Sequence, residues 1–225
     1  FSLILNQNVS RAIQEIKFVE NKEKAKFFES YLLLALDSIK KKNYKKSNLY
    51  LNKLSKFKDE GTFEDMIYET LKGYVITFEK KKIDFSNSKY GNLILINKAF
   101  AGCYLDDTNT IVYFENMINS SSADYSRYLF FYVNYLVSKS KLIDAKNLLL
   151  DVDDLNSSLL ILQTKLWINE NKISNFNKVF SCKNETDILG EFFFLVSNLY
   201  STQEDYEQSN FYLSISNFLN KKFKF

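Results

Sequence analysis

The chain has 225 residues, of which 46% are hydrophobic and 25% charged, a balance typical of a folded protein and not of a disordered one. It contains no histidine, which removes the commonest general base, the usual catalytic triads and every histidine-based metal site. Its formal net charge is +3, from 30 basic and 27 acidic residues, so charge alone does not indicate a nucleic-acid partner.

The N-terminal segment, residues 1–6, has neither an initiator methionine nor a basic region ahead of its apolar residues. It is not a signal peptide as it stands, and we interpret it as the cut edge of a longer chain. No apolar run further along reaches the roughly 18 residues that a transmembrane helix needs. We therefore expect no transmembrane segment in this sequence.

Helical periodicity dominates the rest of the chain. Apolar residues recur three and four positions apart in residues 28–39 and in residues 189–200, which places each set on one face of a helix. With no proline and only five glycines, the chain has little of the turn chemistry that a many-stranded sheet needs. Polar segments that interrupt the helical stripes include residues 41–43, 139–141, 169–171 and 202–204. The pattern predicts short antiparallel helix pairs joined by polar turns.

One motif repeats at the start of several predicted helices. After a polar turn comes an apolar or aromatic residue, and a small residue follows three positions later. A small residue there lets two helices approach closely. Anchored on the small position, the motif recurs at intervals of 35, 39, 27, 32, 31 and 33 residues, and most of these lie near 33, which indicates a helical repeat. Its clearest small residues are Ala12, Ser47, Ala145 and Ser209.

These features resemble tetratricopeptide repeat (TPR) proteins, whose unit is two antiparallel helices in about 34 residues. The resemblance is carried by Tyr31, Leu34 and Ala35 ahead of Tyr44, and by Phe193, Val196, Ser197 and Tyr200 ahead of Tyr206. It implies an all-α, right-handed superhelical solenoid, a single array over residues 1–225 with about six helix pairs and a partial repeat at the N-terminus. Residues 188–219 look like bacterial exported TPR arrays of unassigned role, which implies a periplasmic rather than a cytoplasmic protein.

In TPR arrays the first helix of each pair lines a concave groove, and the resemblance carries this role to positions off the apolar stripes. Phe130 and Phe194, with amide side chains nearby, would suit an extended or helical peptide. The candidate groove residues are Glu29, Leu32, Leu36, Lys40, Arg127, Phe130, Asn134, Ile161, Lys165, Glu191, Phe194 and Asn198.

The chain carries no recognisable catalytic or phosphate-binding motif. Two acidic clusters occur, Asp106 with Asp107 and residues 151–154. The second falls at a predicted helix end, where carboxylates cap the next helix, and it lacks the regular ligand spacing and the glycine of a calcium loop. Cys103 and Cys182 have neither a CxxC motif nor metal-ligand spacing, so we predict two buried thiols in preference to a disulfide or a reactive pair. We expect no catalytic, cofactor-binding or metal-binding residue.

Two functions remain open at this point. The favoured one is a non-catalytic scaffold or adaptor that binds a peptide or protein segment in its groove. The alternative uses the lysine-rich residues 40–46 and 80–82 to dock on nucleic acid or an anionic membrane surface. Because these lysines lie where predicted helices end, we expect them to complement the helix dipoles instead. The balanced charge also argues against nucleic acid, and neither the partner nor the oligomeric state follows from the sequence.

Overall fold

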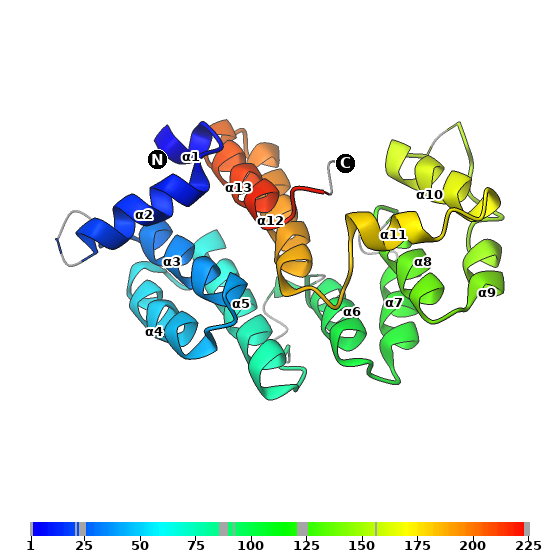
Figure 1. Cartoon of the computed structure of the whole chain (residues 1–225), viewed down its shortest axis with the longest axis horizontal. Coiled ribbons are helices and arrows are strands. Elements are labelled where there is room, and N and C mark those ends of the chain that lie inside the picture. The colour runs from blue at the N-terminus through cyan, green and yellow to red at the C-terminus, as the bar shows by residue number, and fades with distance from the viewer. Residues whose placement is uncertain are drawn as a thin grey trace. The chain divides into compact units, whose positions relative to one another are not determined.

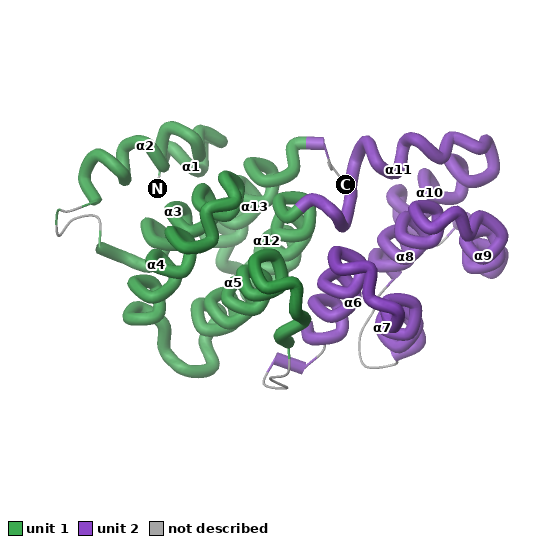
Figure 2. Tube along the Cα trace, turned by 60° about the horizontal axis from the view of Figure 1, so that its bottom comes forward, with its two compact units in different colours: residues 1–85, 185–221 green, residues 86–184, 222–225 purple. Residues whose placement is uncertain are grey.

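The computed structural model describes residues 2–20, 22, 26–85, 90–91, 93–120, 126–155 and 157–222. These residues form thirteen α-helices and contain no β-strand, which confirms the all-α prediction (Figure 1). The chain divides into two compact units (Figure 2).

Unit 1 consists of Phe1–Phe85 and Glu185–Lys221, two segments far apart in the sequence. Its helices are α1 (Ser2–Leu5), α2 (Val9–Val19), α3 (Phe28–Lys40), α4 (Tyr44–Leu54), the 3-10 helix η2 (Ser55–Phe57), α5 (Phe63–Lys80), α12 (Glu185–Thr202) and α13 (Tyr206–Leu219). Helix α3 contacts α4, α4 contacts α5, and α12 contacts α13. In addition, α13 contacts α1 and α2, and α12 contacts α3, so the first and last helices lie side by side.

Unit 2 is built on residues 86–184. Its helices are α6 (Leu93–Leu105), α7 (Thr110–Ile118), α8 (Tyr128–Ser138), α9 (Leu142–Asn147), α10 (Leu159–Asn169) and α11 (Ser174–Val179). Helices α6 and α7 form one pair and α8 and α9 another, while α7 contacts α8 and α10 contacts both α8 and α9. Neighbouring helices along the chain therefore pair in both units.

The contacts of α12 and α13 go beyond those of a linear array. In an array, each repeat touches only the repeats next to it in the sequence. Here the last pair contacts α1, α2 and α3. The single array over residues 1–225 stays a prediction, whereas the helix pairs on which it was based are present.

One turn geometry recurs between the paired helices. In the α3–α4 turn, Lys42 adopts a left-handed conformation (φ 56°), its N–H donates to the Ile39 carbonyl, and the next N–H, of Asn43, donates to the Ser38 carbonyl. This pair of backbone hydrogen bonds is the Schellman motif, in which glycine usually occupies the left-handed position. The same pattern occurs at Gln7, Lys42, Asp106, Ser140, Asn171 and Glu204, at intervals of 31 to 35 residues apart from one gap of 64.

In two of these six turns, the residue after the left-handed position caps the next helix. The Asn43 side chain accepts a hydrogen bond from the Lys46 N–H, and the Asp205 side chain accepts one from the Gln208 N–H. These two polar turns therefore end one helix and cap the start of the next. This explains how the chain makes tight turns there without glycine or proline.

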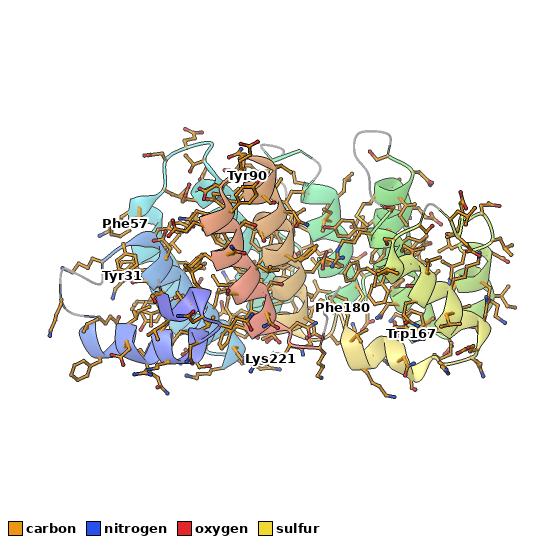
Figure 3. The ribbon with its side chains drawn as sticks, turned by 90° about the horizontal axis from the view of Figure 1, so that it is seen from above. Tyr31, Phe57, Tyr90, Trp167, Phe180 and Lys221 are labelled. Atoms are coloured by element: carbon orange, nitrogen blue, oxygen red, sulfur yellow. A yellow bond between two sulfur atoms is a disulfide. The ribbon has the colours of Figure 1, made fainter. Side chains whose placement is uncertain are left out.

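Aromatic side chains fill much of the interior of unit 1. Tyr212 of α13 stacks on Phe193 of α12, with ring centroids 5.9 Å apart and an angle of 3° between the planes. Tyr31 of α3 meets Phe57 of η2, with centroids 5.7 Å apart (Figure 3). The predicted apolar stripes thus pack ring against ring across paired helices.

A disulfide joins Cys103 of α6 to Cys182, which lies between α11 and α12, with the two Cα atoms 5.9 Å apart. The prediction of two free thiols is therefore wrong. Phe180, two residues before Cys182, packs on Phe100 of α6 and on Phe131 of α8. Because the cysteines are 79 positions apart, only this tertiary contact, and no local motif, brings them together.

Glycine at position 204 should stabilise unit 1, because it adopts the left-handed conformation without the clash that a Cβ atom causes. We expect Glu204→Gly to raise the free energy of unfolding by about 0.5–1 kcal/mol in urea denaturation. Gln203→Gly is the matched control, since Gln203 precedes it in the same turn without a positive φ. Equal effects of the two substitutions would contradict this turn geometry.

Removing the disulfide should destabilise the protein, because the bond closes a long loop that the unfolded chain would otherwise leave open. We expect the double substitution Cys103→Ala and Cys182→Ala to lower the free energy of unfolding by about 2–4 kcal/mol. A reductant should produce a similar loss in the native chain and none in the double variant. If the native chain unfolds identically with and without reductant, the bond is absent in solution.

Candidate functional site

A small pocket in unit 1 lies between α1, α2, α3 and α13, and we call it the unit 1 pocket. Its volume is about 130 Å³, room for a few water molecules or one side chain of moderate size. The apolar residues of its walls are Leu3, Ile4, Ala12, Ile16, Phe27, Leu33 and Phe211.

Local structure explains why these side chains meet. On α2, Ala12 and Ile16 are four positions apart and share a face, and the small Ala12 leaves space between the helices. Phe27 directly precedes α3 in an extended conformation with φ −146°. Leu33 follows on α3, and the buried Phe211 comes from α13, almost two hundred positions away along the chain. The pocket therefore depends on the contact between the two ends of the sequence.

Two acidic residues also line the pocket, the exposed Glu15 and the half-buried Glu29. Neither forms an ion pair with any residue in the described ranges, and this includes Arg11, one turn before Glu15 on α2. Burial, followed by nearby charges that include Glu29, raises the pKa of Tyr212 well above its ordinary value. The pocket thus combines apolar walls with negative charge.

Lysines of α2 and of the α3–α4 turn form ion pairs with acidic residues outside the pocket. Asp37 Oδ2 lies 2.5 Å from Lys17 Nζ and 2.8 Å from Lys41 Nζ. Burial opposes the ionisation of Asp37, but the hydrogen bonds from the two lysines outweigh it and lower the pKa of the carboxyl group. Lys42 Nζ lies 4.0 Å from Glu185. Lys41 and Lys42, which belong to the predicted lysine-rich residues 40–46, therefore make ion pairs within the unit.

The predicted groove residues are distributed over the interior and the surface. Six are buried: Leu32, Leu36, Phe130, Asn134, Ile161 and Glu191. Two, Lys40 and Asn198, are exposed, and four are half-buried: Glu29, Arg127, Lys165 and Phe194. Of the twelve, Glu29 alone lines the unit 1 pocket.

Phe130 and Asn134 lie in the core of unit 2 and not on an open surface. Phe130 has 0% of its surface exposed and stacks on Phe176, with centroids 5.9 Å apart. Asn134 donates from Nδ2 to the backbone carbonyl of Phe180 over 3.1 Å. Both side chains hold α8 against the segment around α11, so neither is available to a partner.

Several predicted groove residues are buried because their helices are surrounded by other helices. Helix α3 contacts α2, α4 and α12, and Leu32 and Leu36 have no exposed surface. Helix α8 contacts α7, α9 and α10, which leaves Phe130 and Asn134 enclosed. On α3 and α8, four of the side chains that a TPR register leaves open are therefore buried by neighbouring helices.

Sequence reasoning did not find Glu15, Phe27 or Phe211 as site residues. Glu15 is one acidic residue among many on predicted helix surfaces. Phe211 reaches the pocket only because α13 contacts α1 and α2. No local pattern in the sequence signals that contact.

The acidic cluster at residues 151–154 takes the turn role that the sequence predicted, and Asp107 takes a similar role in its own turn. The Asp107 carboxylate accepts a hydrogen bond from the Asn109 N–H over 2.7 Å, and the Asp153 carboxylate accepts one from the Leu155 N–H over 2.9 Å. Within the described part of the chain, no group of three or more histidine, cysteine or acidic residues is arranged to hold a metal ion.

No described helix combines the length and the apolar character that crossing a membrane requires. Comparison of the chain with protein-family models, curated proteins and solved structures gives no match. The unit 1 pocket is thus the candidate site on its own geometry.

Truncating Phe130 tests whether it belongs to the core or to a groove. We expect Phe130→Ala to lower the free energy of unfolding by about 3–5 kcal/mol, because it removes a fully enclosed ring and leaves a cavity. Asn198→Ala, at an exposed predicted groove position, should change stability by less than about 0.5 kcal/mol. If both substitutions change the free energy of unfolding by a similarly small amount, Phe130 lies on the surface and not in the core.

Proposed function

We propose that this chain is a non-catalytic scaffold or adaptor, a degenerate TPR-like helical array, that binds a protein segment through the unit 1 pocket. The observation that carries the proposal is an apolar pocket of about 130 Å³ at the junction of four helices. Pockets for small molecules and cofactors are usually larger, about 300–1,000 Å³. One side chain of a bound segment fits the observed volume better.

The repeating turn supports the TPR-like part of the proposal. The left-handed residues recur at intervals close to the TPR period of about 34 residues. At Lys42 and Glu204 the turn is followed by a capping residue and then by the aromatic residue of the repeat motif, Tyr44 or Tyr206. Helix pairs with a common turn are the units from which such arrays are built.

The ionisable groups of unit 1 support a binding role over a catalytic one. The Tyr50 hydroxyl donates to Glu20, and burial together with that carboxylate raises the pKa of Tyr50 to about 12. The Tyr200 hydroxyl makes the same kind of bond to Glu64, and its pKa is raised by burial first and then by Glu64. At neutral pH both tyrosines stay protonated and serve as hydrogen-bond donors between helices, not as bases.

The proposal includes a periplasmic, bacterial location. Disulfides persist in oxidising compartments, among them the bacterial periplasm, and are rare in the cytosol. The Cys103–Cys182 bond therefore fits an exported protein.

Peptide display against the whole chain tests the proposed function. We expect the selected peptides to share an apolar anchor residue. They should bind the Ile16→Ser variant at least about tenfold more weakly than the native chain, because that change removes part of the pocket wall. Val112→Ser is the matched control, since Val112 is also apolar, 48% exposed and outside the pocket. Thermal unfolding confirms that both variants are folded.

Two results would contradict the proposal. One is a selection in which no peptide depends on Ile16. The other is binding to duplex DNA or to anionic vesicles that weakens steeply with salt, while no peptide binds.

A further inference from the structure

We propose that the unit 1 pocket recognises a lysine side chain of the bound segment, with its aliphatic stem against the apolar walls and its ammonium group between Glu15 and Glu29. This inference rests on the proposed function and names the chemistry of its partner.

The apolar walls account for binding of the aliphatic part of the lysine side chain. Ile16, Phe27 and Leu33 come from two helices and the residue before α3, and they present aliphatic and aromatic surface to the pocket. A lysine side chain buries its four methylene groups along such surface and keeps its charged end at the rim. The volume of about 130 Å³ accommodates an unbranched chain of this length.

Glu15 and Glu29 account for recognition of the positively charged ammonium group. Another carboxylate, that of Glu20 directly after α2, already has partners: Lys53 Nζ at 3.2 Å and the Tyr50 hydroxyl. Glu15 and Glu29 have no ion-pair partner among the residues of the described ranges. Glu20, which lies outside the pocket, is therefore already paired, whereas Glu15 and Glu29 at the pocket are available to a cation.

The arrangement also selects against other side chains. An acidic group would meet two like charges, and a neutral polar group would leave both carboxylates without a counter-charge. The planar guanidinium of arginine is larger than the compact ammonium of lysine, so lysine fits a pocket of about 130 Å³ better. Half-burial of Glu29 strengthens the pairing, because a less solvated carboxylate interacts more strongly with a cation.

The first experiment repeats the display selection on three forms of the whole chain. These are the native chain, the double variant Glu15→Gln and Glu29→Gln, and the control Glu207→Gln. Glu207 is an exposed acidic residue of the same unit, on α13 and outside the pocket. We expect the native chain and the control to enrich lysine beside an apolar anchor, and the double variant to enrich the anchor alone.

The second experiment measures affinity for one selected peptide and for its copy with norleucine in place of lysine, which keeps the stem and removes the ammonium group. On the native chain we expect the lysine peptide to bind about threefold to tenfold more tightly at low salt, and the difference to shrink as salt is added. On the double variant the two peptides should bind within about twofold of each other. Unfolding midpoints of all three forms establish that they are folded.

The outcomes separate this inference from the proposed function. If Ile16-dependent peptides are selected without lysine, or if norleucine binds the native chain as well as lysine does, the inference is wrong and the proposed function stands. If no selected peptide depends on the pocket, the proposed function fails and the inference with it.

Discussion

The contact of α12 and α13 with the first three helices is the interaction on which the rest of unit 1 depends. A single helix pair cannot bury its apolar stripe alone. Phe211 on α13 has 0% of its surface exposed and lines the same pocket as Leu3, Ala12 and Leu33. Burial of one such ring contributes about 1.5–3 kcal/mol, so the last helix pair stabilises the first helices substantially. Without this contact the pocket would lose one of its walls.

The turns between paired helices show how the chain manages this architecture with few glycines. A residue such as Lys42 or Glu204 accepts a left-handed conformation, which costs about 1–2 kcal/mol. The next residue, Asn43 or Asp205, caps the following helix and offsets part of that cost. Conformational cost is therefore concentrated in the turns, while stability comes from the aromatic interior that the helices share.

The local features of the fold follow from the sequence, and the non-local ones do not. Apolar spacing in residues 28–39 and 189–200 predicts α3 and α12, and polar segments such as residues 202–204 predict the turns, because both depend on neighbouring residues. The disulfide depends on a contact between segments 79 positions apart. Phe130 was assigned to a groove because a repeat register assumes that one helix face stays open. In the protein α7, α9 and α10 surround that helix.

The central claim is that the two ends of the chain fold as one unit, and hydrogen exchange of the whole chain tests it most directly. The substitution Phe211→Ala removes the α13 ring that lines the pocket together with residues of α1 and α2. The account predicts faster amide exchange in α2 and α3 as well as in α12 and α13, with exchange in α8 unchanged. Faster exchange confined to α12 and α13 would contradict it, because the first helices would then be stable without their contacts to the last helix pair.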